Sequence, residues 1–189
     1  PGAGNFLRGD NSWQEAGGGA WEYVEKVIPT TANTISLLQN NIAVGYDYLI
    51  TWNDVRHQTD TSLTCRLQSG SSPSNITSNY KGTSHYIYDS SGHSYTQQAG
   101  DELHMTRSNI NPGSSSVDQW FGEMLLWEPA TASATCGEFK GGSRNDSTIY
   151  SGLGHFAQID ATAITGVWIG GYGSFAAEGQ FISYRRKRS

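Results

Sequence analysis

Residues 164–184, ITGVWIGGYGSFAAEGQFISY, contain two strand-like segments joined by a glycine-rich turn. Val167 and Ile169 point to one side of the first segment and Trp168 to the other, which is the two-residue period of a half-buried strand. Residues 180–184 alternate in the same way. Because glycine tolerates the positive φ that a chain reversal needs, the stretch predicts a β-hairpin that closes the domain.

The composition indicates one all-β domain. The 189 residues suffice for a single core, and they include 23 glycines, 12% aromatic residues and only 15% charged residues. Twelve basic residues stand against 17 acidic ones, and four of the basic ones lie in the run 185–188. Without that run the balance is 8 against 17, so an acidic body argues against nucleic-acid binding. The run itself is interpreted as a solvated end.

The order of segments predicts a linker followed by a sandwich. Residues 1–20 form a glycine-rich linker or stalk junction, within which residues 5–14 would make a short hairpin or hook. Residues 21–189 form the β-sandwich domain, with polar loops expected at 69–79, 108–118 and 141–151. The predicted strands are 21–26, 34–38, 46–52, 62–67, 81–88, 102–107, 119–127, 134–139, 154–160, 164–169 and 180–184. We expect an antiparallel, jelly-roll-like sandwich of two sheets.

One predicted strand is apolar on both faces. In residues 119–127, Phe121, Leu125 and Trp127 oppose Trp120, Met124 and Leu126. Such a strand is either buried on both sides or placed at a subunit contact.

Two stretches resemble a family of bacteriophage virion proteins. Residues 6–14, FLRGDNSWQ, resemble the "FLRGDGTW" junction of phage tail-fibre proteins. Residues 164–184 resemble the "ITGIRF…SGNFASGTFSLYGL" ending of small phage β-domains, with one extra residue near Glu178 and with 185–189 replacing the Gly-Leu finish. The resemblance implies a trimeric domain on the virion exterior, assembled in the host cytoplasm, that contacts other virion proteins. It implies a distal tail-fibre domain for host attachment or, alternatively, a capsid decoration protein.

A search for catalytic and metal-binding groups gives no strong motif. The five histidines (57, 85, 93, 104 and 155) lack metal-ligand spacing, and no cofactor is predicted. A polysaccharide-cleaving enzyme is the second alternative. Such an enzyme needs two carboxylates about 5–10 Å apart. Its candidates are Asp101, Glu102, Asp118, Glu123 and Glu128. No apolar run is long enough for membrane insertion. The two cysteines, Cys65 and Cys136, are interpreted as free thiols.

Carbohydrate binding is the preferred interpretation, because sugar faces stack on aromatic rings. In a sandwich such rings more often fill the core or its rim. The candidates at loops or strand edges are Tyr80, Tyr88, Tyr95, Trp120 and Tyr172.

Overall fold

The computed structural model describes residues 5–7, 13–15, 20–32, 34–58, 63–88, 93–105, 119–145, 148–170 and 173–188. For residues 5–7, 13–15, 88, 93–99, 145 and 148 the description covers the backbone only. The described chain is built from antiparallel strands without a helix, so the all-β prediction is confirmed. A helix long and apolar enough to cross a membrane is accordingly absent from these residues.

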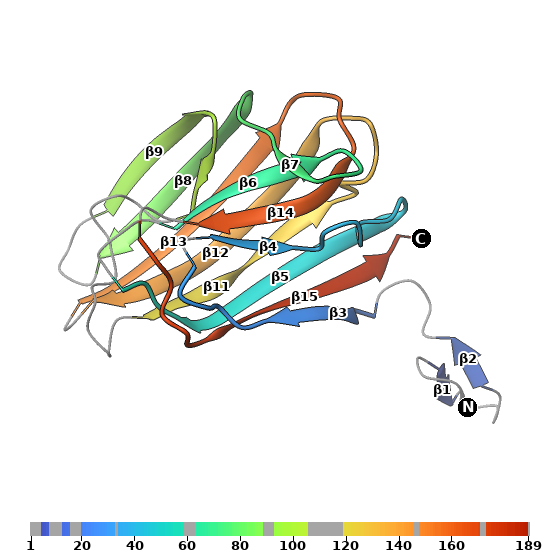
Figure 1. Ribbon diagram of the computed structural model, residues 1–189, viewed down its shortest axis with the longest axis horizontal. Helices are drawn as coiled ribbons and strands as arrows, with labels where there is room; N and C mark the ends of the chain where they lie inside the picture. Colours follow the sequence, from blue (N-terminus) through green and yellow to red (C-terminus); the bar gives the residue numbers. More distant parts are fainter. Residues whose placement is uncertain are drawn as a thin grey trace.

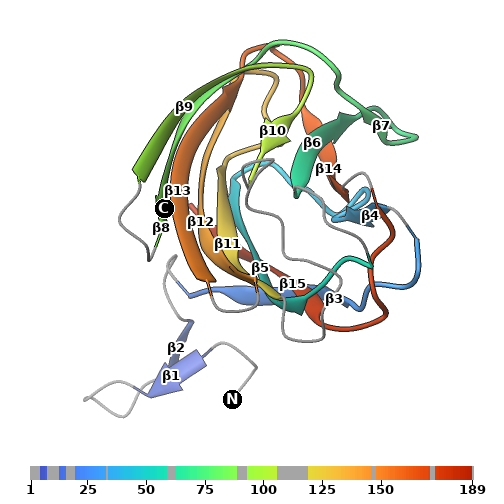
Figure 2. The same cartoon turned by 90° about the vertical axis from the view of Figure 1, so that its left-hand side faces the viewer.

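The larger of two main sheets has eight strands in the spatial order β3-β15-β5-β11-β12-β13-β8-β9. It curves around the smaller sheet (Figure 2). Its strands are β3 (Glu22–Val27), β15 (Gln180–Lys187), β5 (Tyr46–Val55), β11 (Gln119–Trp127), β12 (Thr135–Asn145), β13 (Thr148–Gln158), β8 (Tyr80–Tyr88) and β9 (His93–Gly100).

The smaller sheet has five strands and lies against the inner side of the larger one (Figure 1). Its path is β10-β6-β14-β4, with β7 beside β6. These strands are β10 (Leu103–His104), β6 (Thr64–Ser69), β14 (Ile164–Gly170), β4 (Thr34–Leu37) and β7 (Ser74–Asn75). The predicted two-sheet sandwich is therefore confirmed. The predicted N-terminal hairpin is also present, because β1 (Asn5–Leu7) pairs with β2 (Trp13–Glu15) as a separate two-stranded sheet.

The core lies between the two sheets and follows the two-residue period of the strands. On β5, Tyr48, Ile50 and Trp52 are buried, and on β14 Val167 and Ile169 are fully buried from the opposite side. Alternate residues of each strand point away from this core. This alternation gives the larger sheet a second, outer face.

The C-terminal strands do not form the predicted hairpin. β14 pairs with β6 and β4 in the smaller sheet, whereas β15 pairs with β5 and β3 in the larger sheet. The connection therefore crosses from one sheet to the other. In it Gly179 has a φ of +77°, and a Cβ there would lie 2.4 Å from the Asp54 carbonyl oxygen. Local alternation is the same in both arrangements, so only long-range pairing decides between them.

The predicted loop at 141–151 is also wrong, because most of it belongs to two long strands. β12 and β13 pair without interruption from Thr135 opposite Gln158 to Asn145 opposite Thr148. Several residues of these strands are glycines, and aromatic rings fill the space that a side chain would need. For example, a Cβ at Gly154 would lie 2.4 Å from the Phe139 ring. Strand β9, which no apolar alternation marks, was not predicted either. Neighbouring strands impose the extended conformation where local propensity is weak.

Candidate binding surface

The outer face of the larger sheet carries four of the exposed large apolar side chains. Phe121 of β11 is 44% exposed, and Ile87 of β8, together with Ile149 and Leu153 of β13, is about half exposed. These residues alternate along their strands with residues that face the core. A sheet face with several exposed apolar side chains is typical of a contact surface rather than of a solvated exterior.

A hollow of about 300 Å³ lies on this outer face. The register explains it, because Phe121 is opposite Gly142, Gly142 opposite Ser151, and Ser151 opposite Ile87. Two small residues thus stand in the middle of a row that has large residues at both ends. The residues that line the hollow are His85, Ile87, Phe121, Lys140, Gly141, Ser151, Gly152 and Leu153.

The Phe121 ring rests on the backbone of β12. A Cβ at Gly142 would lie 2.7 Å from Cζ and 3.1 Å from Cε2 of Phe121, so only glycine leaves room for the ring there. One side of the ring packs on the sheet and the remainder is open to the hollow. Such a flat aromatic surface suits the apolar face of a sugar ring or of another planar ligand.

Polar groups stand beside the ring. Lys140 is one residue from Gly141 on β12, and its Nζ lies 2.8 Å from Oε1 of Glu123. The hydrogen bond to Glu123 raises the pKa of Lys140. Ser151 supplies a hydroxyl at the hollow and His85 an imidazole. The surface therefore combines an apolar platform with hydrogen-bonding groups.

The floor of the hollow is supported from the core side. Gly122, Gly141 and Gly152 are opposite one another in a row across β11, β12 and β13. A Cβ at Gly122 would lie 2.7 Å from the Trp52 ring, and one at Gly152 would lie 2.6 Å from the Tyr86 ring. Both rings pack directly on the strand backbones and support the floor of the hollow.

Two of the predicted binding residues lie in the core instead of at this surface. Tyr80 and Trp120 are buried, so the expectation that they lie exposed is wrong. The Tyr80 hydroxyl accepts a hydrogen bond from the Leu67 amide at 2.7 Å and lies within the core. Trp120 alternates to the inner face of β11. Tyr88 and Tyr95 lie on β8 and β9 with only their backbones described, and Tyr172 lies outside the described residues.

The residues that line the hollow were not among the predicted binding residues, although the sequence partly indicates them. Phe121 belongs to the strand with apolar residues on both faces, and Gly141 and Gly142 mark the place where its ring lies. Only the register of β11, β12 and β13 brings these residues next to one another. That register comes from residues far apart in the chain.

The candidate carboxylates are engaged in ion pairs. Asp101 and Glu102 both pair with Arg66, at 3.6 Å and 3.0 Å. Glu123 pairs with Lys140 and Glu128 with Arg188, while Asp118 lies outside the described residues. Within the described residues, no three His, Cys, Asp or Glu side chains gather as metal ligands do. Cys65 is buried and Cys136 exposed, and neither forms a disulfide, so the prediction of free thiols is confirmed.

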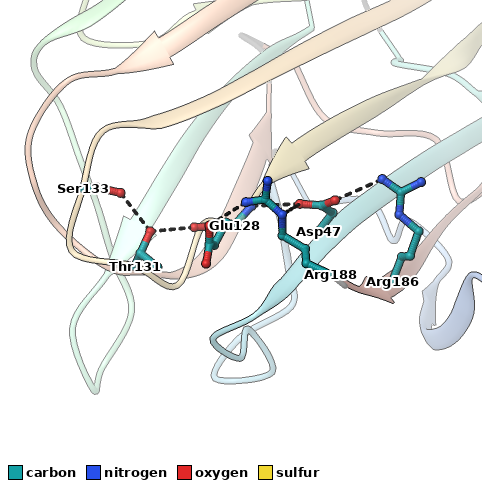
Figure 3. Close-up of polar contacts among 6 residues, drawn as sticks. All are labelled: Asp47, Glu128, Thr131, Ser133, Arg186 and Arg188. Carbon is teal, nitrogen blue, oxygen red and sulfur yellow. Dashed lines mark hydrogen bonds and ion pairs between the residues drawn. The ribbon is translucent and has the colours of Figure 1, made fainter. Parts of the chain in front are cut away.

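The basic run 185–188 is not a solvated end, because three of its residues are tied into the fold. Residues 185–187 belong to β15, and Arg186 and Arg188 reach Asp47 and Glu128 in a network that we call the C-terminal clasp (Figure 3). Asp47 is nearly buried and lies 3.0 Å from Nη2 of Arg186. Its Oδ1 also accepts a hydrogen bond from the Glu128 amide at 3.2 Å. Two carboxylates face two guanidinium groups, so the clasp compensates its own charges.

The clasp lies beside the first strand of the domain. Arg185 pairs with Glu22 at 3.0 Å, and the Arg186 guanidinium lies 4.9 Å from the centre of the Trp21 ring. β3 and β15 are neighbours at one edge of the larger sheet. The first and last strands of the sandwich are thus fastened at the same edge.

The sequence matches no protein-family model, and comparison with curated proteins and with solved structures gave no match either.

Proposed function

We propose that this protein is a structural component of a bacteriophage virion, the distal domain of a tail fibre that attaches to carbohydrate on the host surface. The observation that carries the proposal is the Phe121 ring, which lies on Gly142 inside a hollow bordered by Lys140 and Ser151. Sugars bind by stacking their apolar face on a ring while polar neighbours bind their hydroxyls. The resemblance of residues 6–14 and 164–184 to phage proteins supplies the virion context.

The position of the first and last strands supports attachment through a fibre shaft. β3 and β15 form one edge of the larger sheet, and the hollow lies on β11, β12, β13 and β8 beyond β5. A shaft that leads into β3 would leave the hollow uncovered. The proposal needs no cofactor and no catalytic residue.

A capsid decoration protein is the second candidate, and the exposed apolar residues Ile87, Ile149 and Leu153 favour it. Apolar side chains in such number suit a protein partner as well as a sugar. Both virion roles include a homotrimer. Mass measurement in solution tests the trimer, and a monomer at micromolar concentration would count against both roles.

A glycan array with bacterial surface sugars tests the tail-fibre role. We expect binding that Phe121→Ala abolishes and Tyr23→Ala preserves. Tyr23 is a matched control, because it is an aromatic residue, 63% exposed, on β3 away from the hollow. If both variants retained binding, the carbohydrate would bind at a site other than the hollow. Absence of binding to any sugar would favour the decoration role.

A further inference from the structure

The charges at the hollow differ in sign from the charge of the whole protein. Among the described residues that line it, Lys140 and His85 have ionisable side chains, and both are basic. Lys81 and Arg144, both exposed, lie on the same outer face, on β8 and β12, where Glu123 and Glu138 are the acidic residues near Lys140. The chain as a whole has a net charge of −5. An ammonium group at the border of a hollow on an acidic protein favours an anionic ligand, although Glu123 pairs with this ammonium group.

We propose that the hollow binds a sugar unit that carries an anionic group, a carboxylate or a phosphate, with the sugar ring on Phe121 and the anion at Lys140. This inference rests on the proposed carbohydrate attachment and specifies the class of sugar.

The geometry of Lys140 suits this role. Its side chain is 64% exposed, and an ammonium group has three donors, of which Glu123 engages one at 2.8 Å. The salt bridge holds the ammonium group beside the hollow and leaves donors for an anion. Glu123 also offsets part of the positive charge, so it limits the strength of anion binding.

The spacing and the volume also agree with one sugar unit. Lys140 is two residues before Gly142, which lies under the Phe121 ring, so their Cα atoms are roughly 7 Å apart along the strand. An anionic substituent at the edge of a sugar ring stacked on Phe121 would therefore point toward Lys140. The hollow of about 300 Å³ is at the lower end of ligand pockets, which range from about 300 to 1,000 Å³.

The test compares three probes by isothermal titration: oligogalacturonate, the same oligomer with its carboxylates reduced to alcohols, and a phosphorylated oligomannose. We expect binding of at least one anionic probe, weakened about tenfold or more by Lys140→Gln, since the variant loses a charge-assisted hydrogen bond to the anion. Lys26→Gln is the matched control, because Lys26 is exposed on β3 and the net charge changes equally. Glu123→Gln should tighten binding, since it removes the competing carboxylate. The two anionic arms distinguish a carboxylate from a phosphate ligand.

Some outcomes would overturn the inference and leave the proposed function intact. If the reduced oligomer bound as tightly as the anionic ones and still required Phe121, the site would bind neutral sugar. Equal effects of Lys140→Gln and Lys26→Gln would show that only the overall charge matters. If no probe bound and the glycan array were also blank, the proposed carbohydrate attachment and the inference would fail together.

Discussion

Acid should destabilise this fold through one buried histidine. His57 is fully buried, with its ring centre 4.1 Å from that of Phe175 and 4.6 Å from that of Trp120. Neither ring nitrogen meets the geometry of a hydrogen bond to a described residue. Burial lowers the pKa of His57 from 6.5 to about 4, and the nearby Gly173 carbonyl opposes this effect only in part. The folded protein therefore holds His57 neutral.

The pKa difference fixes the sign and the size of the effect. Because the unfolded chain takes up the proton near pH 6.5 and the folded one only near pH 4, protons favour unfolding between these values. The stabilisation that comes from neutral His57 is complete above pH 6.5, is lost as the pH falls to about 4, and changes no further below that. At about 1.4 kcal/mol per pKa unit, His57 alone removes about 2 kcal/mol of folding free energy between pH 7 and pH 5.

The assay is urea unfolding followed by tryptophan fluorescence at pH 7 and pH 5. The variant His57→Leu cannot titrate, so we expect the wild type to lose about 2 kcal/mol more than the variant over this range. His155→Leu is the matched control, since it removes an imidazole of the same type at an exposed position. A constant free-energy difference between wild type and His57→Leu at both pH values would refute the reasoning. The comparison cancels any packing cost that is independent of pH.

Three further predictions concern the clasp, two glycines with positive φ and the thiols. Asp47→Asn should lower the free energy of unfolding by about 1–3 kcal/mol, because both arginine partners lose a carboxylate; urea unfolding measures it, and no change would show the clasp to be dispensable. Gly45→Ala should cost about 1–2 kcal/mol through its positive φ. Gly179→Ala should cost more, because its Cβ also meets the Asp54 carbonyl, and equal costs would contradict this contact. A thiol reagent should modify Cys136 in the native protein and the buried Cys65 only after unfolding; two reactive native thiols would refute it.

Local pattern was enough to predict much of the fold. The alternation at 46–52 and 119–127 appears as β5 and β11, and the residues expected on one face of β14 are buried together. A strand with one buried face encodes its conformation within a few residues, since side chains alternate strictly. The same logic did not apply to 141–151, where glycine and serine carry no alternation.

The candidate surface could be predicted only in part. The apolar character of both faces of 119–127 predicted either burial on both sides or a subunit contact, and Phe121 is among the residues concerned. Aromatic type alone pointed to Tyr80 and Trp120, which the core contains instead. Whether a strand aromatic faces the core or the solvent depends on which side of its sheet is covered. That information lies in the packing of two sheets and is absent from any single segment.

By itself the sequence determined the extended conformation of most strands and the need for two sheets, because alternating apolar residues must bury one face. Only the tertiary structure decided that β14 and β15 enter different sheets and that Arg186 and Arg188 meet Asp47. It alone placed Phe121 on Gly142 to make the hollow. All three depend on pairing between residues far apart in the chain, and pairing of this kind is set by the collective packing of the sandwich.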